Sequence, residues 1–169
     1  LARDSVSVAK KTGNKLTKID AYRPINKFIQ NVHHFRDACI SDESPPIDHV
    51  VIFDEAQRAW NETQTSNFMK RKKGIPNFKQ SEPDFLISCM DRHKDWAVIV
   101  CLVGGGQEIN TGEAGISAWL EAIALNYPDW NVYISSHMTD SEYRASEAVN
   151  NVMRRDKTFN EDSLHLSVA

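Results

Sequence analysis

The sequence has 169 residues, of which 41% are hydrophobic and 25% charged, and its formal net charge is −3. These values are typical of a folded globular domain and exclude intrinsic disorder and collagen-like repeats. No apolar run approaches the ~20 residues of a membrane-spanning helix, and no secretory signal opens the chain, so we expect no membrane association. The three cysteines, Cys39, Cys89 and Cys101, are a small and odd number, which indicates reduced thiols in the cytoplasm rather than a disulfide framework.

The first half of the chain alternates between helix and strand patterns. A proline at the first position and one apolar face predict a helix over residues 24–40. The continuous apolar run at residues 49–53 predicts a strand that is buried on both faces. Residues 58–81 are polar and are interpreted as a long loop or insertion. A helix over residues 82–96 and a second buried strand over residues 97–103 are expected to follow.

The same alternation continues to the end of the chain. The patterns predict a helix over residues 116–126, a strand over residues 130–135, a polar helix over residues 139–155 and a short last strand over residues 164–168. Strands separated by helices favour crossover connections, and therefore a mainly parallel sheet with helices on both faces. We predict one three-layer α/β domain over residues 1–169, whose chemistry lies beyond the carboxyl ends of the strands.

Two adjacent carboxylates, Asp54 and Glu55, follow the strand at residues 49–53. Because successive side chains on a strand diverge, the two acids can take separate roles. One can hold a hydrated Mg²⁺, and the other can orient or deprotonate a water molecule, as in the Walker B segment of ATP hydrolases. The alternative is that Asp54 caps the next helix and Glu55 lies in its first turn.

Three glycines, Gly104, Gly105 and Gly106, follow the second buried strand. They permit close approach of the backbone to a ligand, but the run matches neither a dinucleotide fingerprint nor a phosphate-cradling P-loop. The amide of Gln107 then projects from the strand end, where it can sense a γ-phosphate or an attacking water; the alternative is a flexible turn with a solvent-facing glutamine. If the two buried strands are parallel neighbours, we expect Gln107 and Asp54 within roughly 10 Å of each other.

Two longer segments carry a resemblance to a known family. Residues 54–60 read Asp-Glu-Ala-Gln-Arg-Ala-Trp, and residues 104–113 read Gly-Gly-Gly-Gln-Glu-Ile-Asn-Thr-Gly-Glu. Together with residues 22–28 and 32–36, these segments resemble the Schlafen-like DNA/RNA helicase domain family. That family is a bacterial group of P-loop ATPases related to superfamily 1 helicases, and the resemblance runs through the whole chain.

The resemblance implies a P-loop NTPase fold of RecA-like type and a nucleic-acid-dependent ATPase activity, with Mg²⁺ and ATP as cofactors. Asp54 resembles the acid that coordinates Mg²⁺ through water, and Glu55 resembles the catalytic base. Gln107 resembles the γ-phosphate-sensing glutamine of the third helicase motif. Contacts to the nucleotide are then expected from Arg58, Gly104, Gly105 and Gly106.

The sequence departs from the family pattern in two places. Helicases usually show Gly-Asp-x-x-Gln in the third motif, whereas Val103 and Gly104 fill its first two positions here. The chain also contains no Gly-Lys-Thr/Ser, and residues 12–15 are only a distant fragment of it. In the family this phosphate-binding loop precedes the matched stretch and a second core domain follows it. We therefore expect the central part of a larger ATPase, with no cofactor bound to this chain alone and no ATP turnover.

A basic run provides the strongest candidate for contact with nucleic acid. The run consists of Lys70, Arg71, Lys72 and Lys73, and it is flanked by Phe68 and Phe78. Consecutive cations attract a phosphate backbone, and aromatic rings can stack on unpaired bases, so DNA or RNA is the expected partner. The alternative is an exposed loop that charge keeps solvated.

Two functions of different classes remain open. The first is the catalytic part of a nucleic-acid-dependent ATPase, completed by the rest of the parent chain. The second is a non-catalytic module that uses an ATPase-like fold to bind nucleic acid or a protein. A zinc site is not expected, because no Cys/His spacing matches one, and the adjacent His33 and His34 would point about 100° apart on a helix.

Overall fold

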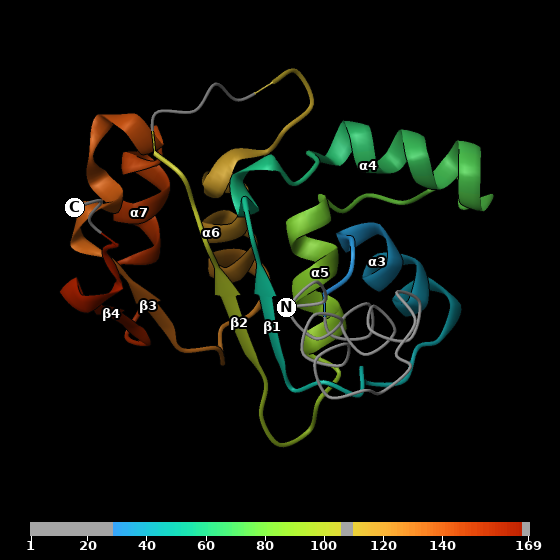
Figure 1. The fold of residues 1–169 in the computed structure, drawn as a ribbon, viewed down its shortest axis with the longest axis horizontal. Coiled ribbons are helices and arrows are strands. Elements are labelled where there is room, and N and C mark those ends of the chain that lie inside the picture. The colour runs from blue at the N-terminus through green and yellow to red at the C-terminus, as the bar shows by residue number, and fades with distance from the viewer. Residues whose placement is uncertain (1–28, 106–109, 167–169) are drawn as a thin grey trace, which may run out of the picture. The chain divides into compact units, whose positions relative to one another are not determined.

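The computed structural model describes residues 29–105 and 110–166 (Figure 1). The chain divides into two compact units, residues 1–43 and 44–169, which are described in turn. The fold is mixed α/β and contains helices and short parallel strands. Within the described ranges, none of the helices is both long and apolar enough to cross a membrane.

In the first unit, α3 spans Val32–Ser41. Asn31 caps this helix, because its side-chain oxygen accepts a hydrogen bond from the backbone N–H of His33 at 3.0 Å. The structure therefore confirms a helix in the second half of the range predicted over residues 24–40, but the helix begins later, at Val32, and ends at Ser41; residues 29–31 are not helical. Residues 24–28 of that prediction lie outside the described part of the chain.

The second unit contains two strands that pair in parallel. β1 spans Val50–Phe53 and β2 spans Val98–Cys101, with Val50 opposite Val98 and Phe53 opposite Cys101. Both strands coincide with the continuous apolar runs of the sequence, and their parallel pairing is as predicted. The pairing places the carboxyl ends of the two strands at the same edge of the sheet, so the segments that follow them emerge side by side.

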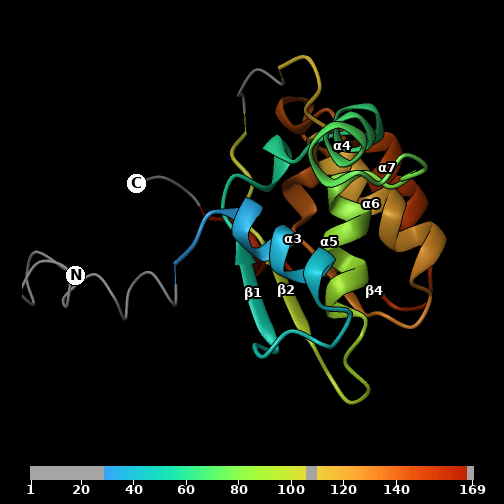
Figure 2. The same ribbon diagram turned by 90° about the vertical axis from the view of Figure 1, so that its right-hand side faces the viewer.

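Helices α5 (Glu82–Met90) and α6 (Gly115–Asn126) lie on one side of the β1–β2 sheet (Figure 2). Phe53 of β1 packs against Trp119 of α6, with the ring centroids 5.2 Å apart. The other face of the sheet carries exposed apolar side chains, namely Val50, Ile52 and Val98. The prediction that both strands are buried on both faces is therefore wrong, because no described helix of the second unit covers these side chains. Within the second unit, helices thus cover one face, and the second helical layer of the predicted three-layer sandwich stays a prediction.

Helix α5 is shorter than the helix predicted over residues 82–96. Ser81 caps its start, since the Ser81 hydroxyl accepts a hydrogen bond from the N–H of Asp84 at 3.3 Å. The helix ends at Met90. The apolar Trp96 extended the helical pattern in the sequence, but it lies in the turn before β2 and is 55% exposed.

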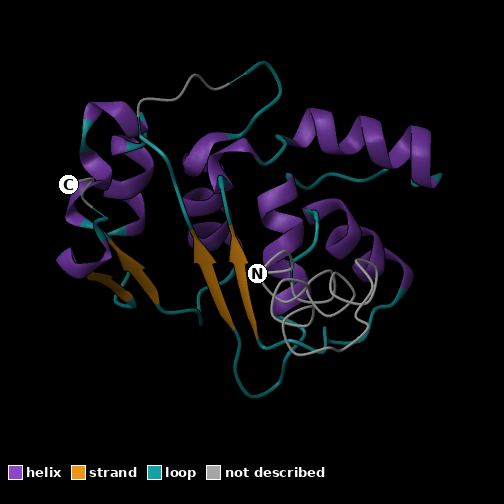
Figure 3. Ribbon diagram, viewed as in Figure 1, coloured by secondary structure: helices purple, strands orange, loops and turns teal. Residues whose placement is uncertain are grey.

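The region predicted as a loop or insertion at residues 58–81 is partly helical (Figure 3). α4 spans Glu62–Phe68 and continues directly into a π-helical turn at Met69–Lys73. The buried side chains of this stretch are Thr65 and Met69. With so few apolar positions, the helix has no hydrophobic period that sequence inspection can detect.

A second parallel pair lies further along the chain. β3 spans Val132–Ile134, inside the strand predicted over residues 130–135, and it pairs with β4, which spans Thr158–Asn160. β4 was not predicted, because Thr-Phe-Asn is not an apolar run. The last strand predicted over residues 164–168 is wrong in its described part, since Leu164 belongs to a 3-10 turn.

The polar helix predicted over residues 139–155 is interrupted. Two 3-10 turns occupy Ser136–Thr139 and Ser141–Tyr143, and α7 spans only Ser146–Val152. Between the second 3-10 turn and α7, Arg144 has a φ of 49°, in the left-handed region. A single left-handed residue ends a right-handed helix, so the prediction joined two turns and a helix that the backbone separates.

The two parallel pairs do not join into one sheet among the described residues. A cleft of about 1140 Å³ is lined by β2, β3 and side chains of α6. In place of the single parallel sheet that the sequence predicts, residues 44–166 contain two parallel pairs with this cleft between β2 and β3.

Candidate functional site

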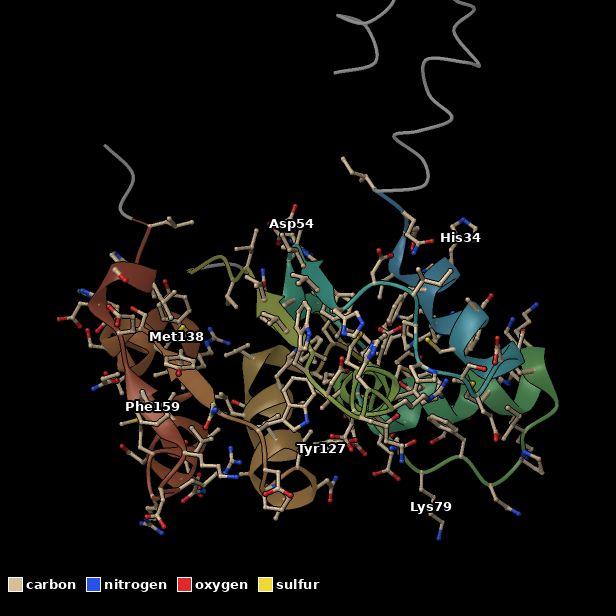
Figure 4. The ribbon with its side chains drawn as sticks, turned by 90° about the horizontal axis from the view of Figure 1, so that it is seen from below. His34, Asp54, Lys79, Tyr127, Met138 and Phe159 are labelled. Carbon is tan, nitrogen blue, oxygen red and sulfur yellow. The ribbon has the colours of Figure 1, made fainter. Side chains whose placement is uncertain are left out.

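Asp54 lies at the carboxyl end of β1, at the start of the turn that follows the strand (Figure 4). It is exposed, and its Oδ1 accepts a hydrogen bond from the N–H of Glu55 at 3.0 Å. Its second carboxylate oxygen has no partner among the described residues. Mg²⁺ keeps several waters and binds proteins through one or two carboxylates, so this exposed oxygen fits the ion that the resemblance assigns to Asp54.

Glu55 has a left-handed backbone, with φ 53° and ψ 43°. Such a conformation costs an L-residue roughly 1–2 kcal/mol, and strain of this kind is concentrated at functional sites. Glu55 Oε2 accepts hydrogen bonds from Gln57 Nε2 at 2.8 Å and from Arg58 Nε at 3.1 Å. The alternative with Glu55 in a first helical turn is wrong, because the 3-10 turn Ala56–Arg58 begins after it.

Ala56 fixes this turn to the neighbouring elements. Its N–H donates to the carbonyl oxygen of Leu102, just beyond β2, at 2.9 Å. Its own carbonyl oxygen accepts a hydrogen bond from Nε1 of Trp119 in α6, at 2.8 Å, and this contact is buried. The backbone that carries the two acids is therefore held from both the sheet side and the helix side, which preorganises their positions.

The two motif segments meet at Glu113. Arg58 Nη1 donates to Glu113 Oε1 at 3.5 Å, while Asn110 donates its N–H to Oε2 at 2.8 Å and its Nδ2 to Oε1 at 3.0 Å. Burial alone would raise the pKa of Glu113, but the Asn110 hydrogen bonds and the Arg58 charge together lower that pKa below its ordinary value. The hydrogen bond to Glu55 is the main reason that the pKa of Arg58 is raised.

Backbone contacts extend this meeting of the two segments. Trp60 and Glu113 form an isolated antiparallel bridge, and the N–H of Asn61 donates to the carbonyl oxygen of Gly112 at 2.9 Å. The segments that carry the family resemblance, which are distant in sequence, therefore lie side by side in their described parts. Arg58, expected to contact a nucleotide, bridges the two carboxylates between them.

The glycines after β2 are only partly described. Gly104 lines the cleft together with the two acids that follow β1. A Cβ on Gly105 would stand against the carboxyl group of Glu142, so the backbone passes close to that side chain. Gly106 and Gln107 lie outside the described residues, and the roles predicted for them, like the distance from Gln107 to Asp54, stay predictions.

The basic run lies on the π-helical turn and not in a loop. Its exposed members are Lys70, Arg71 and Lys72. Lys73 is half-buried, with its Nζ 5.9 Å from the centroid of the Phe68 ring. The flanking aromatic rings also have partners within the protein: Phe68 packs on Trp60 and Phe78 on Phe85. The predicted phosphate contact thus has three exposed cations available, and both flanking rings are partly buried against other aromatic side chains.

Glu113 is the part of this site that sequence inspection missed. It comes last in the second motif segment, directly after Gly112, which has a φ of 100°. An acid that follows a turn glycine is common on protein surfaces, so the residue types alone carried no distinctive signal. Only the fold reveals that Arg58 lies opposite it.

Comparison with protein families agrees with the resemblance seen in the sequence. The model of the family described as Schlafen group 3, DNA/RNA helicase domain, matches residues 4–165. No curated protein and no solved structure gives a significant match. The family match spans the turn after β1, the segment after β2 and both strand pairs. The chain therefore belongs to the Schlafen group 3 DNA/RNA helicase domain family.

Proposed function

We propose that this chain forms the acidic half of the ATP site in a nucleic-acid-dependent ATPase of helicase type. The observation that carries the proposal is the exposed Asp54 beside a strained, hydrogen-bonded Glu55, at the carboxyl end of a strand paired in parallel with β2. Membership of a helicase-domain family supports the same class of function. In parallel α/β sheets, ligands bind at this end of the strands.

Each residue has a separate role in this proposal. Asp54 holds Mg²⁺ through water, and the ion supplies charge neutralisation at the phosphates when it is bound. Glu55 orients the attacking water and accepts its proton, while Gln57 and Arg58 hold the carboxylate in place. Gln107 senses the γ-phosphate, and the backbone N–H groups of the neighbouring glycines contact the nucleotide.

The remaining parts of the site belong, in this proposal, to the rest of the parent protein. The sequence holds no Gly-Lys-Thr/Ser, so the β- and γ-phosphates need a loop from elsewhere. We infer that the two parallel strand pairs belong to one sheet of a three-layer P-loop NTPase fold of RecA-like type. The exposed Lys70, Arg71 and Lys72 contact the phosphates of DNA or RNA.

The test uses the intact parent protein and measures ATP hydrolysis with and without single-stranded nucleic acid. Glu55→Gln should reduce turnover by at least about a hundredfold and leave ATP binding intact, because it removes the base and keeps the shape. Asp54→Asn should also reduce turnover and should raise the Mg²⁺ concentration that turnover requires. The matched control is Glu121→Gln, an exposed acid on α6 that should leave turnover unchanged. Turnover near wild type in Glu55→Gln would refute the catalytic assignment.

One observation favours a second candidate, a non-catalytic module that binds nucleic acid or a protein. The Glu55 carboxylate already accepts two hydrogen bonds from its own turn, as a purely structural residue would. The same variants separate the two functions. In a non-catalytic module, ATP hydrolysis would be at background in the unaltered protein and in Glu55→Gln alike. The substitution would lower stability, and binding to nucleic acid or to a protein would persist.

A further inference from the structure

A second cluster of chemically reactive side chains lies at the opposite end of the β1–β2 pair from Asp54. His49 immediately precedes β1, while His93 and Asp95 lie in the turn between α5 and β2. The strand pairing brings them together, and the N–H of Val98 donates to the carbonyl oxygen of His49 at 2.8 Å. Among the described residues, these three side chains form a group of potential metal ligands that lie close enough together to share one ion.

The ligand atoms of this cluster are close to one another. One potential ligand atom from each of the three side chains lies within 4.8 Å of the other two. The imidazole rings of His49 and His93 have centroids 4.1 Å apart, and their planes differ by 36°. A tetrahedral zinc ion needs donor atoms about 3.3 Å apart, given bonds near 2.0 Å. Asp95 has a 66% exposed side chain, so it can move the remaining distance.

The tautomer of His49 is set by its surroundings. Nδ1 of His49 lies 2.7 Å from the carbonyl oxygen of Trp96. A carbonyl oxygen can only accept, so Nδ1 carries a hydrogen, and in the neutral form of the ring the lone pair lies on Nε2. Metal-binding histidines are oriented in the same way, by donating their other ring N–H to a carbonyl or carboxylate.

His93 supplies an independent observation. Its Nε2 is buried and has no hydrogen-bond partner in the described part of the chain. A buried polar atom without a partner costs roughly 1–3 kcal/mol, and native proteins rarely leave one unsatisfied. A bound cation would satisfy this nitrogen.

We propose that His49, His93 and Asp95 bind a divalent transition-metal ion, with Zn²⁺ as the preferred ion. Two imidazole nitrogens and one carboxylate form a ligand set that zinc accepts, and water completes the tetrahedral coordination. The ion links the start of β1 to the turn before β2, at the opposite end of the strands from the two acids. This site is separate from the proposed ATP site, so it stands or falls independently of that function.

The experiment measures zinc binding to the untagged 169-residue chain after removal of metals with a chelator. Isothermal titration with Zn²⁺ alone should give one saturable site, and Co²⁺ should give the visible absorption of tetrahedral coordination. His49→Gln and His93→Gln should each weaken binding by at least about tenfold. The matched control is His165→Gln, which alters a second stacked pair in which His137 and His165 have ring centroids 4.0 Å apart. That control should bind zinc as the unaltered chain does.

Asp95→Asn keeps the test decisive if a histidine variant fails to fold, because Asp95 is largely exposed. The variant should fold normally by circular dichroism and bind Zn²⁺ several-fold more weakly, without the tetrahedral Co²⁺ spectrum. Absence of saturable binding in the unaltered chain would overturn the proposal. Equal loss of binding in His165→Gln would also overturn it, since it would place the metal at another histidine pair.

Discussion

Arg58 and Glu113, 55 positions apart in the sequence, are joined by a contact of 3.5 Å that connects the turn after β1 to the segment after β2. The same guanidinium also holds Glu55 at 3.1 Å. One cation therefore bridges two carboxylates from the two motif segments. Its side chain is 45% exposed, whereas that of Glu113 is 15% exposed, so the contact lies at the rim of the site.

We expect a modest energetic coupling between Arg58 and Glu113. Urea unfolding of Arg58→Gln, Glu113→Gln and the double variant should give a small favourable coupling free energy, because solvent screens the exposed guanidinium of Arg58. Each single variant should cost more than the coupling alone. Arg58→Gln also removes the contact with Glu55, and Glu113→Gln keeps only one of the two acceptor oxygens that Asn110 uses. Strictly additive free energies would indicate that the 3.5 Å contact contributes nothing.

The coupling free energy between Arg58 and Glu113 should also change with pH in a defined direction. The pKa of Glu113 lies below its ordinary value of 4.5 in the folded chain. Its ionised form therefore adds stability at pH values above the unfolded pKa, and this contribution is lost as the pH falls through the folded pKa. The coupling should be intact at pH 7 and absent in strong acid. Coupling that grew on acidification would contradict the assignment.

Glu82 is expected to be a strong stability determinant. It is only 2% exposed, and its Oε2 accepts a hydrogen bond from the N–H of Trp60 at 3.0 Å. Glu82→Ala should lower the free energy of unfolding by about 2 kcal/mol, because it leaves a backbone donor without its partner. Glu82→Gln keeps an acceptor oxygen and should cost clearly less. Chemical denaturation of both variants checks the order, and equal losses would mean that the hydrogen bond is not the cause.

The thiol of Cys101 is expected to be unreactive in the folded chain. Cys101 retains some exposed surface, yet desolvation by the surrounding protein raises the pKa of its thiol to about 12. Alkylation with iodoacetamide at pH 8, followed by peptide mass spectrometry, should be slower by at least roughly a hundredfold than in urea, because the thiolate is the nucleophile. Similar rates in both states would show that the thiol is not desolvated.

The raised pKa of Cys101 also predicts the alkaline behaviour of the chain. Below the ordinary thiol pKa of 9.0 the folded and unfolded states both hold the proton, so stability is unaffected. Between that value and about 12, the unfolded state ionises first and stability falls as the pH rises. Cys101→Ala should flatten this alkaline decline in thermal unfolding.

Binding to single-stranded DNA or RNA should depend on the exposed part of the basic run. Replacing Lys70, Arg71 and Lys72 by Ala should flatten the dependence of log K on log salt by about two units, given roughly 0.7 per phosphate contact. The melting temperature should change little, because all three side chains are exposed. Lys73 is retained, since it packs over Phe68 and its loss would mix stability with binding.

A charge-matched control accompanies that triple variant. Lys79, Lys94 and Arg154 are exposed cations outside the run, and replacing all three by Ala removes the same charge. We expect the control to bind nucleic acid nearly as the unaltered chain does. An equal change of salt slope in both variants would mean that net charge, and not the position of the run, governs binding.

The sequence predicted the β1–β2 pair and its acids because their signals are local. Val-Val-Ile-Phe and Val-Ile-Val-Cys are continuous apolar runs, and Asp54 and Glu55 directly follow the first. A continuous apolar run of this length is a local strand signal, so the strands and the position of the acids could be inferred without a fold. Their burial could not, because it depends on what covers each face of the sheet, and Val50, Ile52 and Val98 are exposed. The family resemblance then supplied the order of the elements.

Other features depend on contacts that no local pattern encodes. β4 is a three-residue strand, Thr158–Asn160, whose partner lies far away in the sequence. Arg144 adopts a left-handed φ within a pattern that favours helix throughout. His49 and His93 meet only because β1 pairs with β2, and Glu113 meets Arg58 for the same reason. Tertiary pairing, rather than residue type, decides these positions.

The cleft between β2 and β3 has a consequence for how the chain behaves in solution. Among the described residues each of these strands has one paired and one unpaired side, so hydrogen-bonding groups of both backbones are left to water. Such rows act as templates for strands of other molecules, which makes the isolated chain prone to self-association at high concentration. The two unpaired strand sides that line the cleft therefore link the architecture of this chain to its solubility.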